Sequence, residues 1–129
     1  MAKVTLIIAA IVEFVFRGLP AFFASAPVAK LFGLEYIPGA LVYVHPFGAL
    51  MLVFGVMFFM ASKDPVKYKL IIDFGILRYA LGLAAYIVTL ITPGSLATFW
   101  WIHLIVDLVL LVLFVMSRAK ATVAPAAVP

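Results

Sequence analysis

Seven ionisable side chains lie inside segments that are otherwise apolar enough to cross a lipid bilayer. These residues are Glu13, Arg17, His45, Asp73, Arg78, His103 and Asp107. A charged side chain in hydrocarbon costs about 2.5 to 3.5 kcal/mol on insertion scales, so such a residue is expected to face the inside of a helix bundle and to pair there. We therefore expect these groups to fold inward against one another or against a ligand.

The composition is that of a membrane protein with several spans. Hydrophobic residues make up 68% of the 129 residues and charged residues 11%, whereas about a quarter of an average soluble domain is charged. Because each spanning helix needs about 20 apolar residues, four of them use most of the chain. The sequence predicts an all-α fold, a single four-helix transmembrane bundle over residues 1–120.

Proline, glycine and charged residues delimit the four helices. The predicted spans are residues 4–24, 40–60, 65–92 and 97–116. Asp64 is placed to cap the third helix, with Pro65 in its first turn, and Arg118 and Lys120 are expected to end the fourth. Residues 121–129 are rich in small residues and proline, which predicts an extended C-terminal tail.

The first predicted helix has some features of a cleaved signal peptide. Ala24-Ser25-Ala26 resembles a cleavage site, and Lys3 gives a positive start. However, Glu13 and Arg17 interrupt the apolar run, which a signal peptide would keep intact. We predict a retained helix.

Positive residues are distributed unequally between the two ends of the predicted helices. One end carries Lys3, Lys63, Lys67, Lys69, Arg118 and Lys120, and the other carries Lys30. Because Lys and Arg are enriched in cytoplasmic flanks, we expect both termini in the cytoplasm. The scattered cations do not indicate a nucleic-acid partner. The apolar connection at 25–40 is expected to lie in the membrane interface.

The two halves of the chain resemble each other. Glu13-Phe14 followed by Arg17 is echoed by Asp73-Phe74 followed by Arg78, and His45 is echoed by His103, 58 residues later. Two spans per half would give both halves the same orientation. The pattern therefore indicates two parallel two-helix repeats.

Spacing within each helix predicts which charges can pair locally. Glu13 and Arg17 are one helical turn apart and can pair on one face, and Asp107 follows His103 by four residues and can orient its imidazole. Asp73 and Arg78 are five residues apart, about 140° around a helix that turns 100° per residue. Each of these two therefore needs a partner on another helix.

Glycine and proline mark two further features of the helices. Gly48 and Gly55 are seven residues apart, as are Gly75 and Gly82, a spacing that favours close helix packing. Pro46 either kinks the second helix beside His45 or marks a late start of that helix.

Three interpretations of the polar residues remain open. In the first, a buried ion-pair network only fixes which helices meet. In the second, a polar cavity binds a small polar or quinone-like molecule, or relays protons. In the third, His45 and His103 are the two axial ligands of haem b, on helices that lie diagonally across the bundle.

Enzyme chemistry of the kind found in soluble proteins has no support in the sequence. The absence of cysteine excludes disulfides, thiolate metal sites and Fe–S clusters. No phosphate-binding glycine motif, zinc-protease motif or nucleophile motif is present. We expect neither a bound metal ion nor a catalytic activity of its own.

Several short motifs resemble those of the DoxX-like group of small bacterial membrane proteins. They are Arg17-Gly18-Leu19-Pro20 in the first predicted helix, Leu31-Phe32-Gly33 in the connection after it, and a charged third helix. The resemblance implies a four-helix protein of a bacterial inner membrane. Members of that group are linked to quinol-oxidising and other membrane redox complexes, often as accessory subunits, so the resemblance implies an accessory role. It transfers no catalytic residues to this chain.

These observations together predict a small accessory or assembly subunit of a larger, energy-transducing membrane complex. Its expected partners are lipid and either other subunits or further copies of itself. Little of the chain lies outside the predicted helices, and the apolar tail at 121–129 offers a segment that a partner could hold. The rival prediction is a carrier or redox component whose polar core binds a solute, a quinone or haem.

Overall fold

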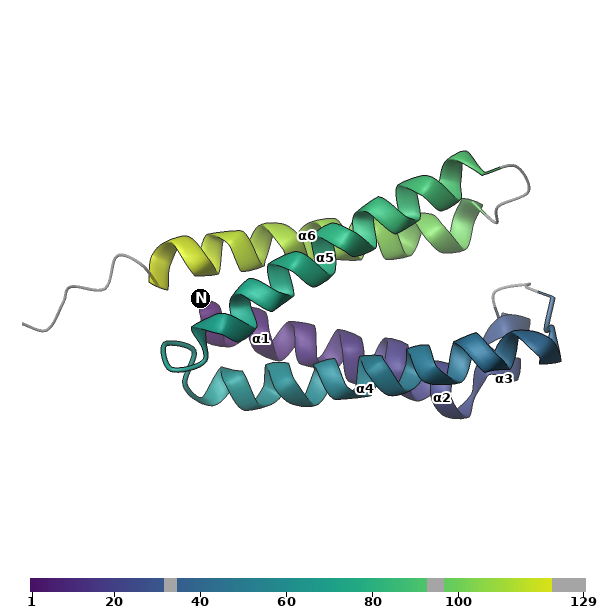
Figure 1. The fold of residues 1–129 in the computed structure, drawn as a ribbon, viewed down its shortest axis with the longest axis horizontal. Helices are drawn as coiled ribbons and strands as arrows, with labels where there is room; N and C mark the ends of the chain where they lie inside the picture. Colours follow the sequence, from purple (N-terminus) through teal and green to yellow (C-terminus); the bar gives the residue numbers. More distant parts are fainter. Residues whose placement is uncertain (32–34, 93–96, 122–129) are drawn as a thin grey trace, which may run out of the picture. The chain divides into compact units, whose positions relative to one another are not determined.

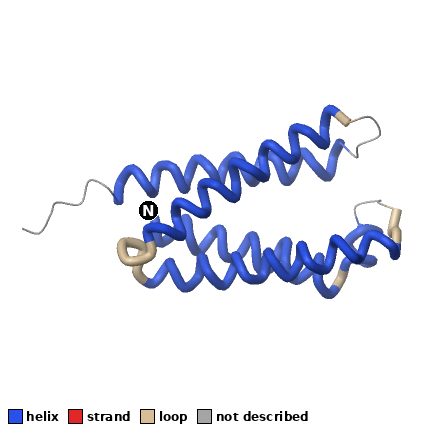
Figure 2. The backbone as a smooth tube through the Cα atoms, viewed as in Figure 1, coloured by secondary structure: helices blue, strands red, loops and turns tan. Residues whose placement is uncertain are grey.

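A computed structural model describes residues 1–31, 35–92 and 97–121, and in these residues the chain is helical, without strands (Figures 1 and 2). Four helices in this part are long and apolar enough to cross a membrane. They are Ala2–Phe23, Pro38–Lys63, Lys69–Ile91 and Trp101–Ala119. The predicted all-α class and the four membrane-length helices are thus confirmed, as expected of an integral membrane protein.

The chain divides into two compact units, each built on one pair of helices. The first hairpin comprises Leu6–Lys63. The second hairpin begins at Asp64, and Met1–Thr5 belong to it as well. Thr5 joins the second hairpin through its Oγ1 atom, which lies 3.0 Å from Ser117 Oγ.

The first hairpin consists of a composite helical run and a single helix antiparallel to it. The first residues of the composite run, up to Thr5, are the ones that belong to the second unit. The first run is made of α1 (Ala2–Ile11), the π-helix η1 (Val12–Gly18) and α2 (Leu19–Phe23). The short helix α3 (Ser25–Leu31) follows, and the 3-10 turn η2 (Pro38–Ala40) leads into α4 (Leu41–Lys63).

The π-helix is a feature that the regular 3.6-residue period does not predict. The Leu19 N–H donates to the carbonyl of Phe14, five residues earlier, as in a π-turn. Pro20 follows at once; it has no N–H, and in a regular helix its ring would clash with the carbonyl four residues earlier. A local widening before proline accommodates both effects inside a membrane helix.

Glycines set the contact between the two long runs of the first hairpin. A Cβ atom at Gly55 would lie 2.6 Å from Phe14 Cβ, and one at Gly48 would lie 2.7 Å from the Phe22 backbone nitrogen. These distances leave no room for a side chain. The predicted packing role of the heptad-spaced glycines is therefore confirmed in α4.

The second hairpin consists of α5 (Lys69–Ile91) and α6 (Ala97–Ala121). A glycine again allows close helix contact, because the Phe114 ring occupies the position where a Gly75 side chain would lie. Tyr79, fully buried, packs against the same ring with centroids 5.5 Å apart. Early residues of α5 thus meet late residues of α6, so the two helices run antiparallel.

The helix boundaries differ from the predicted ones at the connection between α4 and α5. Helix α4 runs on to Lys63, and α5 begins only at Lys69. Between them, Asp64 caps a single turn: its Oδ1 accepts from the Lys67 N–H at 3.1 Å, and its carbonyl accepts from the Tyr68 N–H at 3.1 Å. The predicted capping residue is right, but it caps this turn rather than the membrane helix.

The other differences concern Pro46 and the end of the chain. Pro46 lies inside α4, so the helix does not start there. Helix α6 continues past Arg118 to Ala121, because Arg118 is paired with α5 instead of ending the helix in solvent. Of the predicted tail at 121–129, Ala121 ends α6, and 122–129 lie outside the described residues.

Candidate functional site

The first buried ion pair lies within the π-helix of the first hairpin. Arg17 Nη1 donates to Glu13 Oε1 at 2.9 Å. The two side chains are 3% and 0% exposed, so the pair is removed from both lipid and water. The predicted pairing of residues one turn apart is confirmed.

The second ion pair joins the two helices of the second hairpin. Arg78 Nη1 on α5 donates to Asp107 Oδ2 on α6 at 3.4 Å, and the Asp107 side chain is fully buried. Arg78 therefore has the partner on another helix that its spacing from Asp73 required. Gly82, one turn along α5, leaves the space for this pair, since a Cβ there would lie 2.7 Å from Arg78 Nη1 and in contact with Asp107 Oδ2.

The third pair gives Asp73 its partner on another helix, as predicted. Arg118 Nε on α6 donates to Asp73 Oδ1 on α5. The Arg118 and Asp73 side chains are 30% and 41% exposed, which places the pair nearer solvent than the other two. Arg118 is a residue that sequence reasoning missed, because it was assigned to the end of the helix. The antiparallel alignment set by Gly75 and Gly82 would have identified it.

His103 lies on α6 at the turn before Asp107. Its ring is half-buried and stacks at an angle on Tyr86 of α5, with centroids 5.8 Å apart. Tyr86 is a second residue missed by sequence reasoning. Polar groups occupy successive turns along the contact between α5 and α6. In order along this contact they are Tyr86, His103, Asp107 and Arg78.

His45 lies in the first hairpin, in the second turn of α4. Its side chain is exposed, and its ring centroid is 6.0 Å from that of Phe22. Each of the two predicted haem ligands therefore contacts an aromatic ring of its own hairpin. Within the described ranges, no group of three or more His, Cys, Asp or Glu side chains could hold a metal ion.

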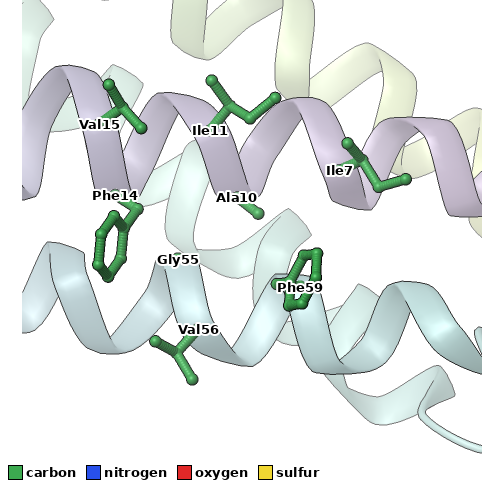
Figure 3. Close-up of a pocket in the computed structure, with 8 residues that line it drawn as sticks. All are labelled: Ile7, Ala10, Ile11, Phe14, Val15, Gly55, Val56 and Phe59. Atoms are coloured by element: carbon green, nitrogen blue, oxygen red, sulfur yellow. The ribbon is translucent and has the colours of Figure 1, made fainter.

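The first hairpin also has an apolar groove of about 360 Å³ between the first helical run and α4 (Figure 3). Its lining residues are Ile7, Ala10, Ile11, Phe14, Val15, Gly55, Val56 and Phe59. The small residues Ala10 and Gly55 are buried, whereas Ile11, Val56 and Phe59 are exposed. Since no polar side chain lines the groove, it accommodates hydrocarbon rather than a polar ligand.

Arginine–carboxylate pairs form within each hairpin. Glu13, Asp73 and Asp107 each accept a hydrogen bond from an arginine of the same hairpin. The two pairs between α5 and α6 can hold these helices in register without a ligand. Comparisons of the chain with models of known protein families, with curated proteins and with solved structures found no match.

Proposed function

We propose that this chain is a small accessory or assembly subunit of a larger, energy-transducing complex in a bacterial inner membrane. The observation that carries the proposal is the internal pairing of the intramembrane acids with Arg17, Arg78 and Arg118. Where such a pair joins two helices, it keeps the helix contact specific, which is a structural role. The helices thereby serve as a scaffold for neighbouring subunits.

The apolar surface of the helices supports the same proposal. Large hydrophobic side chains are exposed along all four membrane-length helices, among them Phe16, Val53, Leu77 and Val112. The described connections between helices are short, so the chain offers its partners mainly the sides of its helices. The resemblance to DoxX-like proteins, which are often accessory subunits, favours this role.

The proposal includes a topology and an internal repeat. The equivalent arginines Arg17 and Arg78 each pair with an acid, although the two acids are not at equivalent positions, and a histidine in each hairpin packs against an aromatic ring. This supports two parallel repeats that share one orientation. The excess of Lys and Arg at one end supports cytoplasmic termini.

The subunit proposal is tested on the full chain in its native membranes. The protein carries a small C-terminal tag, the membranes are cross-linked before solubilisation in mild detergent, and the size of the tagged species is measured. We expect a species much larger than a 14.0 kDa chain in its micelle, and a loss of that complex when the gene is deleted. A lone monomer after cross-linking, with all membrane complexes intact in the deletion strain, would contradict the proposal.

A second candidate function is a carrier or redox component that binds a solute, a quinone or haem. The observation that favours it is the polar succession of Tyr86, His103 and Asp107 along the second hairpin. A Soret absorption band lost in His45→Ala and His103→Ala variants would establish haem. Loss of ligand binding in Arg17→Ala and Arg78→Ala variants, with the helical content unchanged, would establish a carrier. A colourless protein that binds no ligand would contradict this second candidate, and the subunit proposal would stand.

A further inference from the structure

One end of the second hairpin, where α5 begins and α6 ends, has acids that are already engaged. Asp64 Oδ1 accepts from the Lys67 backbone N–H, and Asp73 accepts from Arg118. Both carboxylates therefore have internal hydrogen-bond partners. Asp73 is neutralised by Arg118, and Asp64 is held in its turn by the backbone hydrogen bond.

Three lysines of the same end have no acidic partner. Lys3, Lys67 and Lys69 take part in no ion pair among the residues that the structure describes. Lys67 and Lys3 are exposed, and Lys69 is half-buried. The hydroxyl contact between Thr5 and Ser117 places the start of α1 beside the end of α6, so Lys3 lies at this end too.

Arg118 adds a positioned cation to these lysines. Its Nε atom is fixed by Asp73, and 30% of its side chain is exposed. Lys69 begins α5 one turn before Asp73, on the same helix face. Two acids and four cations are among the described side chains at this end, which therefore keep a positive charge after every internal pair has formed.

The length of α5 bears on how deep Lys69 lies in a membrane. Helix α5 has 23 residues, which corresponds to about 35 Å at 1.5 Å per residue and exceeds a hydrocarbon core of about 30 Å. If α5 spans the membrane, the lysine at its first position lies at the edge of the hydrocarbon core, from which its long side chain can reach the phosphates. Clusters of Lys and Arg at this level attract anionic lipids.

We propose that this basic end, defined by Lys3, Lys67, Lys69 and Arg118, binds the phosphate of an anionic membrane lipid. Charge complementarity carries the assignment: four cations gather at one end of the hairpin, and the acids among them are already hydrogen-bonded. The inference is independent of the proposed subunit role, because it requires only that the hairpin span a membrane.

The test uses the full chain in nanodiscs made of phosphatidylglycerol and phosphatidylcholine in equal amounts. Native mass spectrometry measures which lipid stays bound when the nanodisc is removed. We expect phosphatidylglycerol to be enriched, and Lys67→Gln and Lys69→Gln each to reduce the enrichment about fivefold. Neither variant removes a partner of Asp73. Lys30→Gln, the same charge change in α3, is the matched control and should leave the enrichment unchanged.

Three results would overturn the proposal. The first is equal retention of the two lipids by the natural protein. The second is an enrichment lost equally in the Lys30→Gln control, which would indicate overall charge rather than a site. The third is displacement of phosphatidylglycerol by millimolar inorganic phosphate, which would assign the site to a free anion. Circular dichroism of each variant should show unchanged helical content.

Discussion

Gly82 of α5 faces the Asp107 carboxylate of α6 so closely that a methyl group at position 82 would overlap it. The Arg78 guanidinium lies on the other side of the same space, with Nη1 2.7 Å from the position of that methyl group. The ion pair is therefore enclosed between the helices, and the glycine is a condition for its formation.

Gly82→Ala is expected to lower the free energy of unfolding by about 1 to 3 kcal/mol, because the added methyl group overpacks the contact and separates the paired charges. Unfolding in mixed micelles with increasing denaturing detergent measures the change. Gly39→Ala is the control, since nothing lies within 4 Å of a Cβ there, and it should have almost no effect. Equal stability of the two variants would contradict the close contact.

The partly exposed Asp73–Arg118 pair and the buried Glu13–Arg17 pair should differ in their response to salt. Asp73→Asn is expected to cost less than about 1 kcal/mol, and less still at high ionic strength, because the Asp73–Arg118 pair is partly exposed. Glu13→Gln should cost about 3 kcal/mol at any salt concentration, since its pair is buried. Unfolding curves at low and high salt compare the two. A salt-dependent effect of Glu13→Gln would show that its pair is solvated.

Pro20→Ala is expected to convert the π-helix at Val12–Gly18 into an α-helix. The new N–H can bond to the Phe16 carbonyl four residues earlier, and the clash of the proline ring disappears. Backbone NMR of the protein in micelles detects the change as the loss of contacts between residues five apart. Pro46→Ala in α4 serves as the control and should leave the π-helix intact. Persistence of the π-pattern in Pro20→Ala would assign its cause to tertiary packing.

Removing the hydroxyl pair at the basic end should lower the free energy of unfolding only slightly. Thr5→Val removes the contact between Thr5 Oγ1 and Ser117 Oγ, and one neutral hydrogen bond contributes about 1 kcal/mol. We expect a destabilisation of this size, and a double variant with Ser117→Ala that costs little more. Thermal unfolding of the single and double variants provides the comparison. Strictly additive losses would mean that the two hydroxyls do not interact.

Local spacing was enough to predict what depends on one helix. The Glu13–Arg17 pair follows from residues one turn apart, and the need of Asp73 and Arg78 for partners elsewhere follows from their angular separation. The four membrane-length helices followed from hydropathy and from the proline, glycine and charged residues that delimit them. These features depend on neighbours in the sequence, so the sequence alone defines them.

Partner identity and helix ends depend on contacts between helices. Arg118 was expected to end the fourth helix, but its pairing with Asp73 lets α6 continue to Ala121. Tyr86 was not singled out, because only the antiparallel alignment of α5 and α6 brings it to His103. The π-helix was missed because the 3.6-residue period was assumed throughout, although Pro20 could have suggested a local change.

The central claim is that oppositely charged side chains on different membrane helices neutralise each other, and the Arg78–Asp107 pair tests it most directly. The measurement is a double-mutant cycle of unfolding free energies with Arg78→Gln, Asp107→Asn and both together. We predict a coupling energy of about 1.5 to 3 kcal/mol, since each single variant leaves a buried group without its partner. Additive single-variant losses, with a coupling energy near zero, would contradict the account.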